Sequence, residues 1–372
     1  MIKNNKSNNS NINNTSTNMN SAINTNPVTN ASAVSMVQSG FRRRRVRFMI
    51  VTALLAVLTL ILCFFMLYLG NTKYSLDVII KVLSGENIKG ASFAIGTIRL
   101  PRMLAGLLAG MAFGMAGNTF QTMLRNPLAS PDIIGVTSGS SVAAVFCILI
   151  LNISGSMVSI LAVIAGLAVS FLIYFLSRGG SFSGGRLILI GIGIQAMLNA
   201  VISFLLLRAN QYDVPAALRW LSGSLNGMQM KNIPMLFIIV FVFGLILTLL
   251  GRQLKILELG EQSAITLGLR TDSTRIFMIL SAVFLIAYAT AVTGPISFVA
   301  FLAGPIAGRL SGAGNSNVLP AGLTGATLVL LADLIGQFTF DIRFPVGIIT
   351  GILGAPYLIY LLIRMNRTGG TA

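Results

Sequence analysis

The sequence is poor in charged residues and has no histidine. Aspartate, glutamate, lysine and arginine make up 9% of its 372 residues, whereas 55% are hydrophobic. A water-soluble domain carries about 25% charged residues because its surface must be wetted. A chain with so little charge needs lipid as the solvent for most of its length, so the composition predicts an integral membrane protein.

Features on which most enzymes depend are missing as well. Without histidine, the chain lacks the commonest metal ligand and the commonest general base. The two cysteines, Cys63 and Cys147, lie inside long apolar runs, which argues against a disulfide scaffold and a zinc site. No glycine-rich loop ends in Lys-Ser or Lys-Thr, so the chain has no evident nucleotide site. We therefore expect no enzymatic activity, no cofactor and no bound metal.

The formal net charge of +17 does not predict a nucleic-acid partner. The basic residues lie in short segments between apolar runs, which is the distribution that sets membrane orientation. If the N-terminus is cytoplasmic, 17 of the 26 lysines and arginines fall on the cytoplasmic side. The cluster of Arg42 to Arg45 with Arg47, directly before the first apolar run, strengthens this bias. Both termini are therefore expected in the cytoplasm.

Two regions differ in composition. Residues 1–45 are dominated by asparagine, serine and threonine and end in the basic cluster, which predicts a disordered cytoplasmic tail. This tail is either a passive extension or a regulatory, partner-binding segment. Residues 46–372 form the expected transmembrane domain.

Ten apolar runs divide the second region. They lie at about 48–69, 103–120, 133–151, 156–176, 187–207, 234–250, 276–292, 296–308, 318–335 and 346–363. The expected fold is all-α, a polytopic membrane bundle of about ten transmembrane helices. Gly294-Pro295 interrupts the seventh and eighth runs, and such a break requires cover from protein or a water-filled cavity. Glycines four residues apart, at 106, 110 and 114 and at 347 and 351, predict close helix packing.

Several motifs occur in a fixed order. The first runs from Arg99-Leu100-Pro101-Arg102 through Gly117 and Gln121 to Arg125-Asn126-Pro127-Leu128-Ala129-Ser130-Pro131 and Gly135. The others are Leu259-Gly260-Glu261 with Ala264 and Gly268, Gly294 to Val299, and Pro345-Val346-Gly347 with Gly354-Ala355-Pro356. Over residues 46–364 this pattern resembles the FecCD-type permeases of ATP-driven importers for ferric siderophores, haem and cobalamin. The last motif is most similar to that of ferric-siderophore permeases that pair with a second, non-identical permease.

The resemblance implies a multi-pass permease of the bacterial cytoplasmic membrane that carries a ferric siderophore. It also implies a homologous, non-identical second permease, two cytoplasmic ATPases and an extracytoplasmic binding protein as partners. Permeases for haem or cobalamin remain alternatives, and no residue pattern selects among the ligands. A proton-coupled secondary transporter and a membrane scaffold are competing classes.

The resemblance also assigns roles to individual residues. Arg99 and Arg102 look like docking arginines for glutamates of the binding protein, and Arg343 lies near the place of a third. Interfacial anchoring by long side chains is the alternative for the first two.

Leu259, Gly260, Glu261, Ala264 and Gly268 resemble the loop that couples to the ATPase. We expect a short helix entered through Gly260 and ended at Gly268, with the small Ala264 against the partner. An ordinary solvated loop is the alternative.

Polar side chains in the apolar runs are the last candidates. Gln195, Asn199 and Ser203 recur every four residues, so they share one helix face and are expected to line the substrate path or to hold helices together. Asp333 is the acidic residue deep in the later runs, and we expect a structural hydrogen bond there.

Overall fold

The computed structural model describes residues 27–177, 184–312 and 314–367. Within these ranges the chain is helical and has no β-strand, as expected. It divides into two compact units, Met1–Val46 and Arg47–Ala372. The second unit contains the membrane-spanning bundle and all the sites discussed below.

The first helix is longer than its apolar run. Helix α1 spans Pro27–Tyr68, so residues 27–45, which we expected to be disordered, are helical. An established helix extends at little cost because the unfavourable nucleation step has already been made. Residues 1–26 lie outside the described residues, so the prediction of a disordered tail applies to them alone.

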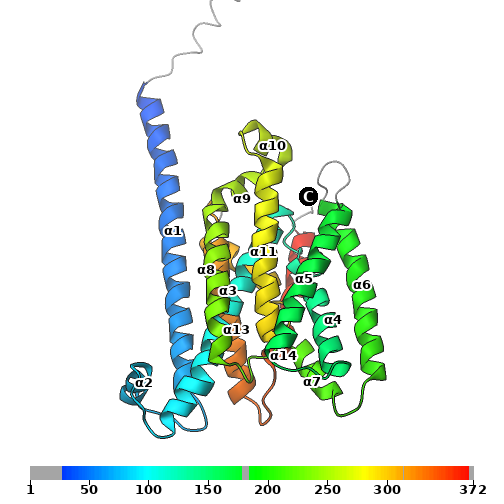
Figure 1. Ribbon diagram of the computed structural model, residues 1–372. Helices are drawn as coiled ribbons and strands as arrows, with labels where there is room; N and C mark the ends of the chain where they lie inside the picture. Colours follow the sequence, from blue (N-terminus) through cyan, green and yellow to red (C-terminus); the bar gives the residue numbers. More distant parts are fainter. Residues whose placement is uncertain (1–26, 178–183, 313, 368–372) are drawn as a thin grey trace, which may run out of the picture. The chain divides into compact units, whose positions relative to one another are not determined.

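Ten helices of the described chain correspond to the ten apolar runs (Figure 1). Eight are long and apolar enough to cross a membrane, and two shorter apolar helices, α4 and α12, complete the set. The long helices are α1, α3 (Leu100–Met123), α5 (Ser156–Ser177), α6 (Gly184–Arg208), α8 (Ile233–Leu249), α11 (Thr271–Thr293), α13 (Val318–Phe338) and α14 (Val346–Arg367). The shorter ones are α4 (Val136–Leu149) and α12 (Val299–Ser311). The protein is therefore a multi-pass membrane protein.

Helix α3 is the centre of the bundle. It continues a short π-helical segment, η1 (Ser92–Arg99), and it packs against α8, α11, α12 and α13. Its glycines allow this packing: a Cβ at Gly110 or Gly114 would overlap the backbone of α13, and one at Gly117 would overlap the carbonyl of Ala300 in α12. The four-residue glycine spacing therefore marks a helix–helix contact, as predicted. Gly351 of α14, in contrast, has open space beside it.

The break between α11 and α12 is covered by protein, as the membrane environment requires. Helix α11 ends at Thr293, whose carbonyl accepts a hydrogen bond of 2.7 Å from the backbone N–H of Ser224. The N–H of Gly347, at the start of α14, donates to the carbonyl of Gly223 at 3.1 Å. Gly223 and Gly294 adopt positive φ angles of 65° and 71°, and a Cβ on either would overlap the opposite backbone. The segments around Gly223, Gly294 and Gly347 thus form hydrogen bonds with one another's backbone.

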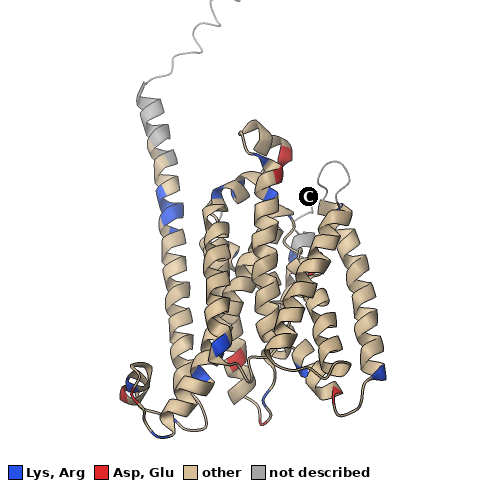
Figure 2. Cartoon of the chain, viewed as in Figure 1, with Lys and Arg blue, Asp and Glu red and all other residues tan. Residues whose placement is uncertain are grey.

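Short helices lie at the two ends of the bundle (Figure 1). Helices α2 (Leu76–Leu83) and α7 (Val214–Leu221) are at one end, which we call the α2 end. Helices α9 (Gly251–Glu258) and α10 (Glu261–Thr266) are at the other, the α10 end. The 3₁₀ turns η2 (Pro131–Ile134) and η3 (Met230–Asn232) precede α4 and α8. Charged residues gather at these two ends and leave the middle of the bundle apolar (Figure 2).

Candidate functional site

Arg99 lies at the α2 end and binds the end of a neighbouring helix. Its guanidinium donates to the carbonyls of Leu67 at 2.8 Å, Tyr68 at 3.2 Å and Thr72 at 2.6 Å, and it lies 5.4 Å from the centre of the Tyr74 ring. These carbonyls belong to the last turn of α1 and to the loop after it, where the helix dipole favours a cation. Arg99 is half-buried and fixes the end of α1 to the start of α3.

Arg102 is buried inside the bundle, which differs from the exposed docking position we expected. Its guanidinium meets Asp333 of α13 through two hydrogen bonds, of 2.8 Å from Nε and 2.7 Å from Nη2. Its Nη1 donates to Asn226, and Gln337 donates to the same carboxylate at 2.7 Å. Arg102 is 8% exposed and Asp333 1% exposed. In this conformation the guanidinium has no free face for a partner, and the structural role expected for Asp333 is confirmed.

The three arginines nevertheless line one cavity. It has a volume of about 190 Å³ and lies between the end of α1, the start of α3 and the end of α13. Arg343 is exposed at its rim and donates to Asn71 at 2.9 Å. The structure thus brings the three arginines proposed from the sequence to one cavity, and of the three Arg343 is the exposed one.

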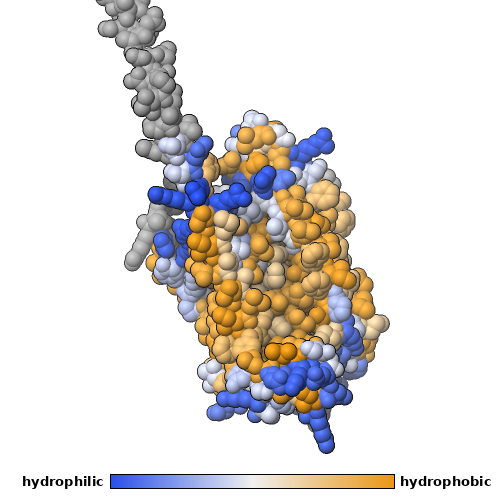
Figure 3. Space-filling model, turned by 90° about the vertical axis from the view of Figure 1, so that its left-hand side faces the viewer, coloured by the Kyte–Doolittle hydropathy of each residue, from blue (hydrophilic) through white to orange (hydrophobic). Residues whose placement is uncertain are grey.

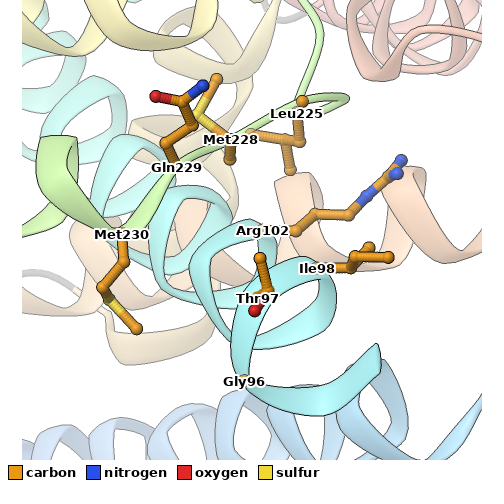
Figure 4. Close-up of a pocket in the computed structure, with 9 residues that line it drawn as sticks. Gly96, Thr97, Ile98, Arg102, Leu225, Met228, Gln229 and Met230 are labelled. Carbon is orange, nitrogen blue, oxygen red and sulfur yellow. The ribbon is translucent and has the colours of Figure 1, made fainter. Parts of the chain in front are cut away.

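A second cavity of about 300 Å³ adjoins it at the α2 end. Met228, Gln229 and Met230 line it from the segment before α8, and Gly96, Thr97 and Ile98 line it from η1 (Figure 4). Arg102 also lines this cavity, and its side chain extends to Asp333 of α13. The rest of the lining is mainly apolar.

At the opposite end, the loop between α8 and α11 folds as expected. Gly260 adopts φ 106° and ψ 158°, a conformation that only glycine tolerates well, and α10 begins at the next residue. Gly268, with φ 81°, follows the helix. Three large apolar side chains of this segment are exposed: Leu259 by 63%, Ile265 by 56% and Leu267 by 62%. We call these three residues the α10 apolar tip.

The structure corrects the orientation that we expected for Ala264. This side chain is 0% exposed and belongs to the hydrophobic core of its own chain, so it does not face a partner. Glu261 is also engaged within the chain, in an ion pair of 3.4 Å with Arg275. The sequence analysis missed Ile265 and Leu267. Of the small residues in this segment, Ala264 alone is buried, whereas Gly268 has open space beside it.

Two of the sequence motifs meet at this end. A Cβ at Gly260 would lie 3.4 Å from a guanidinium nitrogen of Arg125, which has a positive φ of 50°. Gln121 connects the same region to α12, because its amide nitrogen donates to the carbonyls of Pro127 at 3.0 Å and Phe301 at 2.9 Å. Residues 121–131 therefore pack against the α10 end and connect it to α12.

Helix α6 carries the predicted path residues on its outer side. Asn199 and Ser203 are exposed and Gln195 is half-buried, although all three lie within a helix long enough to span the membrane. The Ser203 hydroxyl donates to the carbonyl of Asn199 at 3.0 Å, a bond within the helix. Their polar face therefore lies away from the core of this chain and contacts none of the sites above.

The ten apolar helices of the described chain, with charged and polar residues at the ends of the bundle, define a polytopic membrane protein. The sequence model of the FecCD transport family matches residues 27–364. The chain belongs to this family. It is 36% identical over 299 residues to the ferric enterobactin transport system permease protein FepG of Escherichia coli (strain K12), covering 80% of this chain and 91% of that protein.

Two further comparisons agree with this assignment. The chain is 34% identical to the Fe(3+)-citrate import system permease protein YfmE of Bacillus subtilis (strain 168), over 86% of this chain and 96% of that protein. A solved structure of a metal-chelate type ABC transporter in an inward-facing conformation is 27% identical, with a TM-score of 0.75, and the match covers 84% of this chain and 98% of that one. The fold is thus that of an ABC transporter permease.

Proposed function

We propose that this chain is the permease subunit of an ATP-binding-cassette importer that carries a ferric siderophore across the cytoplasmic membrane. Family membership supports the transport class, and relatives named for ferric enterobactin and Fe(3+)-citrate support the cargo class. Chemical energy then comes from separate ATPase subunits, because this sequence has no phosphate-binding loop.

The α10 apolar tip is the observation that carries the proposal. A short helix and its flanking residues that expose Leu259, Ile265 and Leu267 beyond the membrane-spanning helices cost free energy in water unless another surface covers them. A helix with exposed apolar side chains suits a groove on a partner protein. In an importer of this kind, that partner is the ATPase.

The proposed contact between the α10 apolar tip and the ATPase also determines which end of the chain faces the cytoplasm. If the α10 end contacts a cytoplasmic ATPase, then the last turns of α14, which lie at the same end, are cytoplasmic too (Figure 1). The basic majority of the chain then lies inside, as the positive-inside rule requires. The α2 end faces outwards, where the cavity with Arg99 and Arg343 is available to acidic groups of a binding protein.

The exposed polar face of α6 supports a second permease as partner. The side-chain amide of Asn199, exposed at membrane depth, needs either water or polar groups of another subunit, because lipid offers no hydrogen bonds. A path between two permeases provides both. A homologous, non-identical second permease is the partner that we propose.

A proton-coupled secondary transporter is less well supported. Such a protein needs a titratable group in the membrane that is free to exchange protons. Asp333 is instead held by Arg102 and Gln337 and is 1% exposed. Its carboxylate therefore serves as a counter-ion within the bundle.

The test is an Ile265→Asp, Leu267→Asp variant in the reconstituted complex. The expected result is loss of ATPase co-purification and of substrate-stimulated ATP hydrolysis, with a normally folded permease. Tyr212→Asp is the matched control, because Tyr212 is 95% exposed in the loop between α6 and α7, lines neither cavity at the α2 end, and is expected to leave both readouts unchanged. Normal ATPase binding by the tip variant would show that coupling occurs elsewhere.

A further inference from the structure

Helix α2 has three sectors around its circumference. Val78, Ile79 and Val82 point into a hydrophobic cluster formed with α1, η1 and α3, and Ile79 is 3% exposed. Asp77 and Lys81, which form an ion pair of 2.7 Å, occupy the opposite side. A third sector between the other two is formed by Leu76, Ile80 and Leu83.

The third sector is apolar but uncovered. Leu76 is 55% exposed, Ile80 61% and Leu83 49%, and their spacing of four and three residues places them on one stripe. A helix at the surface of a water-soluble protein has two sectors, one towards the core and one towards water. The third sector indicates a third environment, which is neither the interior of this chain nor water.

The position of α2 identifies this environment. The helix begins eight residues after the end of α1, beside the end of the bundle (Figure 1). Apolar side chains that face outwards from α1, including Phe64 and Phe65, are exposed to the lipid shortly before that end. Figure 3, seen from the side on which α1 lies, shows apolar surface along the bundle and again near its lower end, beside basic residues. The uncovered stripe therefore lies where the hydrocarbon of the membrane meets its headgroups.

The charges around α2 fit the same boundary. Lys73 and Lys89 flank the helix in the sequence and are exposed. Lysine is typical of the interface because its charged end reaches the headgroups while its apolar stem remains in contact with hydrocarbon. Lysine side chains also attract the phosphate groups of lipids.

We propose that α2 is a membrane-interface anchor whose Leu76, Ile80 and Leu83 insert between the lipid headgroups and acyl chains. Inserted helices of this kind lie ~5–10 Å deep at that boundary. The anchor also affects the cavity lined by Arg99, Arg102 and Arg343. Gly70, Asn71 and Thr72, in the loop between α1 and α2, line the same cavity. Asn71 and Thr72 bind Arg343 and Arg99. By fixing this loop at the membrane surface, α2 holds the cavity at a constant height above the bilayer.

The experiment places single spin labels on α2 in the full complex in lipid vesicles. Ile80→Cys reports on the apolar stripe, and Lys81→Cys, the next residue along the helix, is the matched control on the polar side. Both are made after Cys63 and Cys147, which are buried, are replaced by alanine. The ratio of collision rates with oxygen, which concentrates in lipid, to those with a water-soluble nickel chelate is expected to be several-fold higher at 80 than at 81.

Two outcomes would overturn the proposal. Equal ratios at the two positions would show that the stripe is in water. A label at 80 that is shielded from both relaxing agents in the complex, but not in the isolated permease, would show a protein interface.

A triple variant, Leu76→Ser with Ile80→Ser and Leu83→Ser, gives a second measurement: hydrogen exchange over residues 70–84 in vesicles should rise. Unchanged exchange would mean that the lipid contact does not hold the helix. Neither measurement depends on transport, so each can fail independently of the proposed function.

Discussion

Removing one partner of the Arg102–Asp333 pair should destabilise the bundle strongly. Both side chains are almost fully buried, and two hydrogen bonds of 2.7 and 2.8 Å join them. Loss of one partner from such a pair leaves the other charge buried and unpaired, which costs about 3–5 kcal/mol. Asp333→Ala and Arg102→Met are therefore each expected to lower the free energy of unfolding by that amount. Gln337 and Asn226 cannot replace the missing charge.

The double variant separates this structural role from a docking role. With Arg102→Met and Asp333→Leu together no charge remains unpaired, so most of the loss should be recovered. The assay is reversible unfolding in mixed micelles as a double-mutant cycle, with a coupling energy of roughly 5 kcal/mol or more expected, since the two single losses together amount to ~6–10 kcal/mol. Single variants within about 0.5 kcal/mol of the native protein would refute the reasoning. Arg102 would then be a residue whose charge is available to a partner, as the sequence suggested.

Three further predictions concern packing, orientation and docking. Gly114→Ala should lower the free energy of unfolding by about 1–3 kcal/mol, because a Cβ there overlaps α13, whereas Gly351→Ala should change it by less than ~0.5 kcal/mol; equal effects would contradict the close contact. An impermeant maleimide on intact cells should label Lys73→Cys and leave Ser35→Cys unlabelled, and the opposite result would invert the proposed orientation. Arg343→Glu should weaken binding-protein docking by about 1 kcal/mol, roughly a fivefold rise in Kd that shrinks at high salt, without changing stability; wild-type affinity would exclude Arg343 from the docking face.

Helix number and order were predictable from sequence because lipid imposes a simple rule. A helix that spans the membrane needs about 20 apolar residues, so spanning helices appear as long apolar runs in the sequence. The break at Gly294-Pro295 was visible for the same reason, since no continuous helix passes through it. Helices α2 and α7 were not predicted. Each has eight residues, and so short an apolar pattern cannot be told from a loop without knowledge of what it packs against.

The sequence predicted where the candidate site residues lie along the chain, but not the direction in which their side chains face. The sequence located the short helix after Gly260 and the arginines near the start of α3. It did not show that Ala264 faces its own core while Ile265 and Leu267 face outwards, because a helix of six residues has too few positions to define a face. Nor did it show that Arg102 reaches Asp333, which is 231 residues away in the sequence. That contact depends on how α3 and α13 pack, which only the three-dimensional structure determines.

The motifs that identify the family mainly hold this fold together. Gly117 lets α12 approach α3, Gln121 joins α3 to α12, and Arg102 pairs with α13. At the junction of three segments, Gly294 and Gly347 admit backbones that any side chain would exclude. Residues fixed by packing constrain the helical scaffold, and relatives of this chain are named for different iron chelates, ferric enterobactin and Fe(3+)-citrate. In this chain the polar face of α6 lies outside these motifs, whereas both cavities at the α2 end are lined in part by Arg102 of the first motif.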